Sequence, residues 1–421
     1  MDQAIQLLPG VTLRCFPDHR FKHGCLSVQL VRPMCRAEAA MNALLPAVLL
    51  RGSRKHPDLR AITLGLDDLY GASVSALVRR VGDYQTTGLY CSFMEDRFAM
   101  AGDQILAPMV DFVRELLLEP DLEQGCLRAD YVDSEKKNLI ATIESQLNDK
   151  RAYAMEQMIK RMCSADSFGI PRLGEKEDVA AITAHTLSAH YRRILGESPI
   201  NLCYVGSAPA DTVAALLKPV FSDIDRNYVN LPTQTSLCSQ PGGSHTEVME
   251  VNQGKLCMGF VTPVTIRDSG FVAMQLLNAV FGGGMTSKLF MQVRERHSLC
   301  YAIGSGYHGS KGIVTVSAGI DSAMFETVRQ QILAQLEACR NGDITDEELV
   351  AAKQSLRSSL QATHDSPGAM ENYYATGTLS GLGMTPDEYA DAVEQTTAEQ
   401  VAQAAGQLQL HTVYFLKGVA E

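Results

Sequence analysis

Two pairs of histidines have a spacing that could serve metal binding. His19 and His23 stand four residues apart, which on a helix would place both imidazoles on one face within reach of one ion. Residues 16–24, however, have the composition of a hairpin turn, so the spacing loses its geometric meaning. His185 and His190 are five apart on a predicted helix, where they point about 140° away from each other. Neither pair predicts a metal site.

The cysteines could supply thiolate chemistry. All eleven are spread singly, and no two form a Cys-x-x-Cys pair. An odd number of separated cysteines favours buried apolar side chains in a reducing compartment over a disulfide framework. Cys300 stands beside Tyr301, but no His and Asn context that would activate a nucleophile is recognisable around it. We interpret Cys300 as a small core residue.

Gly282, Gly283 and Gly284 form a further motif with a chemical meaning, because glycine loops can bind phosphate. The triplet lacks the Lys-Ser/Thr ending of a phosphate-binding loop and has no strand directly before it. One interpretation is a flexible lip over a peptide channel. The interpretation that we favour is a turn between helices that requires positive φ.

Composition and charge limit the classes of function. The 421 residues are 46% apolar and 20% charged, which is typical of a globular protein with more than one domain. The 37 basic and 48 acidic residues leave a net charge of −11, which argues against nucleic acid or an anionic membrane as a partner. The first residues lack the basic start of a signal peptide, and the apolar run at residues 43–50 is far shorter than the ~20 residues of a membrane span. We expect a soluble, cytoplasmic protein.

The chain divides into two similar halves. Residues 222–246 are rich in Ser, Thr, Asn, Gln, Pro and Gly and are the best linker candidate. They separate two predicted domains, residues 1–225 and residues 246–421. Both halves contain strands, then two helices, a pair of strands and long helices. This order predicts a tandem duplication of an α+β unit.

Apolar periodicity predicts the individual elements of each half. In the first half, we expect strands at residues 11–15, 25–30, 73–80 and 84–95, and helices up to Gly52 and at residues 58–69, 101–118 and 122–160. In the second half, we expect strands at residues 255–263, 299–307 and 312–320, and helices at residues 271–281, 286–296, 322–340 and 345–363. Short polar or glycine-containing turns between neighbouring strands indicate antiparallel hairpins. Each half is therefore predicted to be a mainly antiparallel sheet with helices packed on it.

One long ordered motif carries a family resemblance. It starts as LNAVFGGGMTSKLF at residues 277–290 and continues as VRERHSLCYAIGS at residues 293–305. This motif resembles the second-half signature of the pitrilysin/insulinase metallopeptidases, and the order of elements is similar from residue 8 to residue 417. The resemblance implies two homologous α+β halves that close like a clam around a chamber with a zinc-dependent proteolytic centre.

The zinc centre of that family is an inverted His-x-x-Glu-His motif. Two histidines on one helix face bind the metal, and the glutamate acts on the metal-bound water. Alignment on the helix end at residues 48–53 puts Ala43, Pro46 and Ala47 at these three positions. None of the three can bind a metal or accept a proton. Pro46 also predicts that the helix kinks or begins anew there.

The third zinc ligand of the family is missing as well. Of two carboxylates that the family has on a later helix, Glu135 is retained, whereas the other position is Thr142. The resemblance therefore implies no catalytic residue, no metal ligand and no zinc cofactor in this chain. We interpret it as a non-catalytic homologue, similar to the inactive partner subunits found in Gram-positive bacteria. Such a homologue is expected to associate with a zinc-bearing paralogue or with itself, and to bind a peptide or an unfolded protein segment.

A homologue without zinc ligands can still contain the residues that bind a substrate. Arg294 and Tyr301 occupy the positions whose family equivalents hydrogen-bond a substrate backbone, so the resemblance implies a substrate-binding role for both. The alternative is that Arg294 caps a helix and Tyr301 packs in its strand. Residues 73–78 fall where the family adds a substrate to a sheet edge by main-chain pairing, and the alternative there is an ordinary edge strand.

Three functions remain open from the sequence. The leading one is a non-catalytic protein that binds peptide or completes the chamber of an active paralogue. The second is an active metallopeptidase with a relocated metal site, for which the candidates are His56, Glu95, Asp96 and Glu135. The third is a purely structural assembly subunit, like the core proteins of the respiratory cytochrome complex that share the family's fold.

Overall fold

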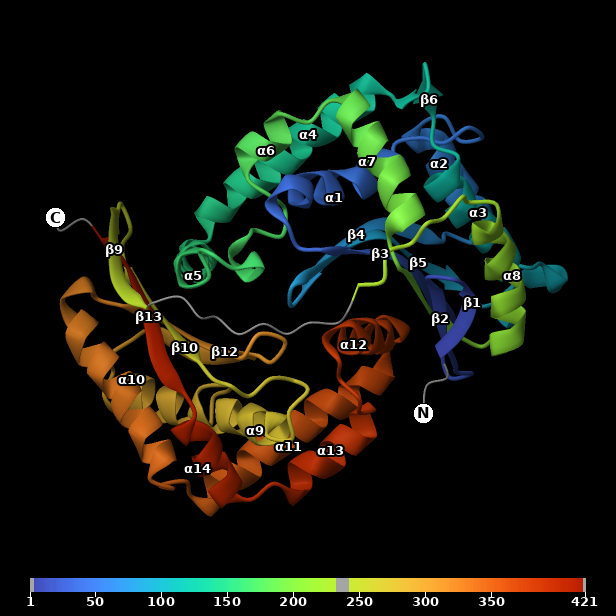
Figure 1. Ribbon diagram of the computed structural model, residues 1–421. Helices are drawn as coiled ribbons and strands as arrows, with labels where there is room; N and C mark the ends of the chain where they lie inside the picture. The colour runs from blue at the N-terminus through green and yellow to red at the C-terminus, as the bar shows by residue number, and fades with distance from the viewer. Residues whose placement is uncertain (1–3, 232–241, 419–421) are drawn as a thin grey trace. The chain divides into compact units, whose positions relative to one another are not determined.

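The computed structural model describes residues 4–231 and 242–418. The chain forms two compact units, each assembled from separate stretches (Figure 1). The first unit contains Met1–Glu144, Ile170–Thr233 and His364–Leu379, and the second unit contains Ser145–Gly169, Gln234–Thr363 and Ser380–Glu421. The predicted linker lies partly outside the described residues, and strand β9 (Gly243–Met249) begins inside it. The domain boundary between residues 225 and 246 stays a prediction.

Six strands form a mixed sheet in the first unit. Their order is β1-β2-β8-β3-β5-β4, and every neighbouring pair is antiparallel except β2 and β8. Alternation along β3 sends Leu26, Val28 and Leu30 to the main core, and Ser27 and Gln29 to the opposite face. The strands are β1 (Ala4–Leu8), β2 (Val11–Pro17), β3 (His23–Pro33), β4 (Ser73–Val81), β5 (Tyr84–Met94) and β8 (Ile200–Gly206).

Helices cover both faces of this sheet (Figure 1). On one face, helices such as α1, α3 and α7 bury Leu44, Met109 and Ile194 in the same core as Leu26. Helix α12 lies on the other face. The helices are α1 (Arg36–Leu49), α2 (Leu59–Asp68), α3 (Leu106–Leu118), α4 (Ala129–Ser145), α6 (Lys176–Ala180), α7 (Ala184–Glu197), α8 (Ala210–Ser222) and α12 (Pro367–Ser380). A short hairpin of β6 (Leu122–Glu123) and β7 (Cys126–Leu127) precedes α4.

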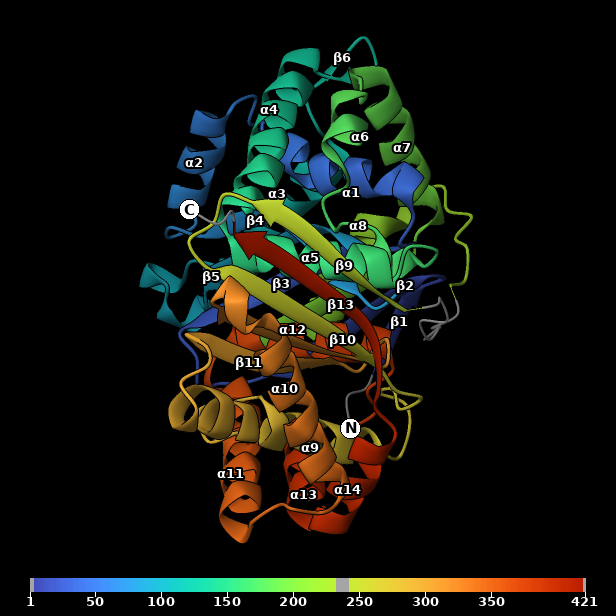
Figure 2. The same cartoon turned by 90° about the vertical axis from the view of Figure 1, so that its left-hand side faces the viewer.

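The second unit has a five-stranded sheet (Figure 2). Its order is β11-β12-β10-β13-β9, and only β13 and β9 are parallel. The further strands are β10 (Gly254–Val261), β11 (Ala302–His308), β12 (Ile313–Ile320) and β13 (Gln409–Gly418). The helices are α5 (Lys150–Met162), α9 (Phe271–Phe281), the π-helix η5 (Leu289–Arg296), α10 (Phe325–Arg340), α11 (Asp346–Ala362), α13 (Pro386–Gln395) and α14 (Ala398–Gly406). Short 3-10 segments are η1 (Asp96–Phe98), η2 (Met100–Gly102), η3 (Gln146–Asn148), η4 (Ser167–Gly169), η6 (Ser322–Met324) and η7 (Thr363–Asp365).

The predicted fold class is confirmed. The chain is an α+β protein with two mainly antiparallel sheets that carry helices, and each sheet includes one parallel pair. The clam-like chamber stays a prediction. Among the described residues, no helix combines the length and the apolar character needed to cross a bilayer.

The two halves of the sequence exchange one helix each. α5 follows α4 in the chain but packs on the second sheet, where Met158 and Met162 lie against Gly259. A Cβ at position 259 would come within 2.5 Å of the Met162 sulfur, so the glycine makes room for the helix. α12 follows α11 but packs on the first sheet, where Ser27 Oγ donates to Glu371 at 2.7 Å. The equivalent position of the exchanged helix in both halves supports the predicted duplication.

Two predicted helices differ from the structure. The single helix expected at residues 122–160 begins later, because the hairpin occupies its first residues and α4 follows. It is also interrupted before α5, where Asp149 accepts hydrogen bonds from the N–H groups of Arg151 and Ala152. Gly125 in the hairpin has a φ of +78°, a conformation that ends a helix. The helix expected at residues 286–296 is the shorter π-helix η5.

Candidate functional site

Helix α1 carries the three positions that the family resemblance aligns with the zinc motif. Ala43, Pro46 and Ala47 lie within one continuous helix, so the predicted restart at Pro46 is wrong. The ring of Pro46 leaves the carbonyl of Asn42 without its intrahelical donor. Thr87 Oγ1, on strand β5, donates to this carbonyl at 2.6 Å. The hydroxyl replaces the lost helical hydrogen bond, and this is how the helix continues through the proline.

The third ligand position lies on α4 and has no metal-binding group. Thr142 Oγ1 donates to the backbone carbonyl of Asn138 at 2.9 Å, as exposed helical threonines commonly do. Glu135, the retained carboxylate, is held by Arg51 at 3.4 Å and by the side chain of Asn138 at 3.1 Å. The residues at the three ligand positions of this chain therefore offer no set of metal-binding atoms.

The structure does not bring the candidates for a relocated metal site together. His56 pairs with Glu115 at 2.9 Å, and the Glu95 carboxylate accepts a hydrogen bond from the Ser207 backbone, also at 2.9 Å. Asp96 accepts two backbone hydrogen bonds at the start of α3, and Glu135 is occupied by Arg51. Within residues 4–231 and 242–418, no three His, Cys, Asp or Glu side chains form a group that could hold a metal ion.

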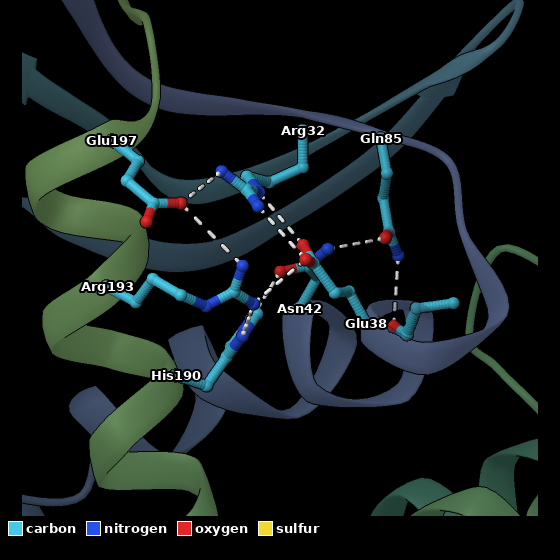
Figure 3. Close-up of polar contacts among 8 residues, drawn as sticks. Arg32, Glu38, Asn42, Gln85, His190, Arg193 and Glu197 are labelled. Carbon is cyan, nitrogen blue, oxygen red and sulfur yellow. Dashed lines mark hydrogen bonds and ion pairs between the residues drawn. The ribbon is translucent and has the colours of Figure 1, made fainter. Parts of the chain in front are cut away.

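A buried polar network lies in the first unit around Asn42, the residue before Ala43 on α1 (Figure 3). This network was not predicted from the sequence. Asn42, which is fully buried, donates to Gln85 Oε1 at 2.9 Å and accepts from His190 Nε2 at 2.7 Å. Arg193 donates to the other imidazole nitrogen of His190 at 3.0 Å. An imidazole that accepts at one nitrogen and donates at the other is neutral, and burial lowers the pKa of His190 to about 4.

Charged residues complete this network (Figure 3). Arg32 contacts Glu38 through two hydrogen bonds of 2.9 and 3.0 Å, and Arg193 donates to the same carboxylate at 2.8 Å. Burial acts to raise the pKa of Glu38, but the two arginines outweigh it and hold that pKa at about 2. Arg32 also pairs with Glu197 at 3.4 Å. The network ties α1 to β3, β5 and α7, and its role is to position these elements.

The predicted substrate-binding residues Arg294 and Tyr301 both lie in the second unit. Arg294 is on η5, where its guanidinium stacks over the Phe290 ring at 4.6 Å and pairs with Glu295 at 3.6 Å. It makes no hydrogen bond to a carbonyl of the described chain, so the helix-capping alternative has no support. Tyr301 donates its backbone N–H to Gly319 at 2.9 Å and leaves its side chain 63% exposed.

Cys300 itself is a core residue, as predicted. It is 8% exposed, and burial raises its pKa to about 11 although Arg294 acts in the opposite direction. A thiol with a raised pKa is protonated near neutral pH and is a poor nucleophile.

Beside these residues the second unit contains a cavity of about 770 Å³. Its walls come from the start of α5, the turn after α9, the first part of η5 and the strands β11 and β12. Residues that line it include Arg151, Met155, Gly284, Phe290, Ser305 and Ser317. Phe290 is thus shared between the cavity wall and the Arg294 side chain. Cavities of ~300–1,000 Å³ are typical of ligand sites in proteins.

The glycine triplet forms one wall of this cavity. It is a turn after α9, as predicted, but none of the three glycines has positive φ, so that part of the prediction is wrong. Gly282 is required for space instead, because an added Cβ would come within 2.6 Å of Ser305 Oγ and 2.8 Å of a Leu289 methyl group. Gly284 faces open space. The triplet allows the turn to lie close against η5 and β11.

Strand β4 is the last strand of the first sheet, as expected for residues 73–78. Ser73, Ser75 and Ala76 are exposed. Towards its end, Arg172 donates to the Val78 carbonyl at 2.8 Å. The stretch before Val78 is therefore the part of this edge that remains accessible for main-chain pairing.

Comparison with known proteins connects these features to one family. The family model described as "Peptidase M16 inactive domain" matches residues 181–356. The chain is 28% identical over 409 residues, 97% of its length and 96% of the relative's, to the probable inactive metalloprotease YmfF of Bacillus subtilis. Its structure is similar to that of a conserved protein from Enterococcus faecalis V583, with a TM-score of 0.92 and 27% identity over 100% of this chain and 99% of that one. A peptidase M16 inactive domain from Pseudomonas fluorescens shares the fold, with a TM-score of 0.81, 17% identity, and coverage of 100% and 98%.

These similarities extend over nearly the whole chain, and they agree with the motif at residues 277–305 and with the duplicated α+β fold. With Ala43, Pro46 and Ala47 in place of the metal-binding motif, this chain is similar, over nearly its whole length, to a probable inactive metalloprotease, and its residues 181–356 match the model of an inactive M16 peptidase domain.

Proposed function

We propose that the protein is a non-catalytic M16 homologue that binds an extended peptide on its second unit and works beside a zinc-bearing paralogue. The observation that carries the proposal is the cavity of about 770 Å³, whose wall residue Phe290 stacks with Arg294, together with the exposed Tyr301 of the same unit. A cavity rimmed by an aromatic ring and an arginine suits a ligand that has both apolar and hydrogen-bonding groups.

The binding mechanism rests on groups that recognise any peptide backbone. The guanidinium of Arg294 only donates, and the phenol of Tyr301 both donates and accepts, so the pair matches carbonyl and N–H groups without reading side chains. Stacking on Phe290 limits the motion of the guanidinium and reduces the entropy lost on binding. Neither contact needs a metal or a general base, so both are compatible with the loss of the zinc motif.

The edge of β4 is a separate surface of the first unit that supports the same function. A peptide can pair with the accessible main chain before Val78 without any catalytic side chain. Hydrolysis, where it occurs, belongs to the partner's metal centre. We place the complex in the cytoplasm, in keeping with the singly spread cysteines, and a second copy of the chain is the alternative partner.

Fluorescence polarisation with an N-terminally labelled pool of random decapeptides tests the binding role. The double variant R294A/Y301A is expected to bind about thirtyfold more weakly, because two hydrogen bonds of ~1 kcal/mol each are lost and each 1.4 kcal/mol is a factor of ten. Arg296→Ala is the matched control, since Arg296 lies on the same helix and its side chain contacts Gln292 at 3.2 Å. Equal affinity of all three proteins would contradict the role of Arg294 and Tyr301. Absence of binding in the wild type would favour the structural-subunit function.

Metal content and cleavage test the non-catalytic part of the proposal. Elemental mass spectrometry of the purified protein is expected to find far less than one zinc per chain. A quenched peptide should show no cleavage that a chelator abolishes. One tightly held zinc per chain with chelator-sensitive turnover would overturn the assignment of Ala43, Ala47 and Thr142 to the ligand positions.

A further inference from the structure

Arg151 is an arginine of the cavity wall whose position is set by its surroundings. It stands in the first turn of α5, and its Nε donates to Ser317 Oγ at 3.0 Å. Ser317, 5% exposed, is the cross-strand partner of Gly304 on β11. A Cβ on Gly304 would lie 3.9 Å from the terminal Nη2 of Arg151, so the guanidinium rests over the bare backbone of this strand pair. Ser317 and Gly304 together hold the guanidinium in the cavity.

The charge of Arg151 is not compensated inside the cavity. Among the described residues, its two terminal nitrogens have no hydrogen-bond acceptor and no carboxylate within ion-pair distance. Asp149 is the carboxylate of the lining, and its Oδ1 is occupied by the backbone N–H groups of Arg151 and Ala152. The backbone N–H groups of Gly284 and Met285, which also line the cavity, likewise have no acceptor within the described part of the chain. The cavity therefore presents the terminal nitrogens of one guanidinium and two backbone N–H groups that have no acceptor among the described residues.

The remainder of the lining is apolar at several points. Met155, Met285 and Phe290 contribute flexible thioethers and an aromatic ring. Met285 is 75% exposed, so its thioether is accessible to a ligand. A ligand with an anionic end and an apolar body would satisfy both kinds of wall.

The geometry points to a binding site for a peptide carboxylate, with Arg151 as its anchor and the methionines and Phe290 around the neighbouring side chain. A guanidinium with two free nitrogens is the side chain best suited to a carboxylate, because both N–H groups can bind its two oxygens at once. The carboxylate can be the C-terminus of the peptide or an Asp or Glu side chain. This inference rests on the proposed peptide binding and names the ligand group that the cavity selects.

Equilibrium dialysis with defined peptide pools tests it. One pool holds acetylated random hexapeptides without Asp or Glu that end in a free carboxylate, and a second pool holds the same sequences with an amide end. A third pool holds peptides with an amide end and one Glu. The fourth pool is identical except that Gln replaces the Glu. The pools are mixed in one sample, and mass spectrometry measures how much of each peptide the protein retains. Two ratios follow: peptides with a free carboxylate end over those with an amide end, and Glu peptides over Gln peptides.

The wild type is expected to retain one carboxylate form about tenfold over its neutral match, the gain typical of a hydrogen bond to a charged group. Which of the two ratios is raised identifies the source of the carboxylate. Arg151→Gln should bring that ratio to about one, while the exposed Arg296→Gln should leave it unchanged. Gly304→Leu places a side chain under the guanidinium without removing a charge, and it should lower the ratio of the carboxylate form to its neutral match, which keeps the test informative if R151Q misfolds.

Two outcomes separate this inference from the proposed function. Pools that bind equally well with and without carboxylates, and that still lose affinity in R294A/Y301A, would overturn the role of Arg151 alone. Failure of every pool to bind the wild type would overturn both.

Discussion

Replacement of Glu371 should release α12 from the first sheet. Glu371 is fully buried and accepts hydrogen bonds from Ser27 at 2.7 Å, Gln29 at 3.0 Å and the two terminal nitrogens of Arg79 at 2.9 and 2.7 Å. Glu371→Ala leaves Arg79 and the Ser27 hydroxyl without their acceptor, whereas the Gln29 amide still donates to Ser27 Oγ at 3.1 Å. Removal of one partner from a buried ion pair costs about 3–5 kcal/mol. Because the Arg79 side chain is 23% exposed and can turn to water, we expect about 3 kcal/mol.

Hydrogen exchange followed by mass spectrometry measures this loss in α12 itself. A loss of about 3 kcal/mol in the free energy of local opening accelerates exchange of the α12 amides roughly a hundredfold, because each 1.4 kcal/mol is a factor of ten. The matched control is Glu337→Ala, which breaks an exposed pair with Arg340 at 3.0 Å that contributes about 0–1 kcal/mol. Exchange in α12 that changes less than threefold in E371A would refute the reasoning. So would equal acceleration by the control.

Three further predictions concern the network beside Ala43 and the glycine turn. The pKa of His190 falls from 6.5 in the unfolded chain to about 4 in the fold. Its contribution to the free energy of unfolding should therefore be fully present above pH 6.5, and the free energy of unfolding should decrease by up to about 3 kcal/mol as the pH falls towards 4. Urea midpoints between pH 5 and 7.5 should show this slope in the wild type and lose it in His190→Gln; equal slopes would contradict the assignment. Thr87→Val should cost about 1–3 kcal/mol in urea unfolding, because it leaves the buried Asn42 carbonyl without a donor. The neighbouring Thr86→Val is its control and should cost little, since the buried Thr86 hydroxyl has no hydrogen-bond partner in the structure; similar losses in both would count against the explanation for Pro46. Gly282→Ala should cost about 1–3 kcal/mol by overpacking against Ser305 and Leu289, and a midpoint equal to that of the wild type would show that the turn has room to adjust.

On α1, Ala43 aligns with the first position of the zinc motif, and its neighbour Asn42 belongs to the buried network. In a zinc peptidase this helix must aim two histidines at a metal, and in this chain Asn42 instead joins Gln85 and His190. A fully hydrogen-bonded network in a low-dielectric interior holds its elements in one arrangement. Helix α1, which has no metal-binding side chains at positions 43 and 47, thus makes specific polar contacts, and Thr87 makes the proline compatible with it.

Local information in the sequence was enough for much of the fold and for part of the site. Apolar periodicity predicted the strands around Cys25 and Cys257 and most helices, because alternation and the 3.6-residue repeat express which face is buried. The α+β class follows from the same patterns. The absence of metal-binding side chains at Ala43, Ala47 and Thr142 is a property of residue type, so the sequence alone determined it. The motif at residues 277–305 carried the family resemblance.

Contacts between distant residues were decided only by the tertiary structure. The exchange of α5 and α12 depends on which sheet offers a complementary surface, and no local pattern near Met158 or Glu371 expresses that. The positive φ expected for the glycine triplet was wrong, because close packing against Ser305, and not backbone conformation, requires Gly282. The carboxylate site inferred for the second unit depends on Arg151 and Ser317, which are 166 positions apart and meet only when α5 crosses the second sheet. Residue types set what chemistry this chain can do, and the folded backbone sets which of those residues meet.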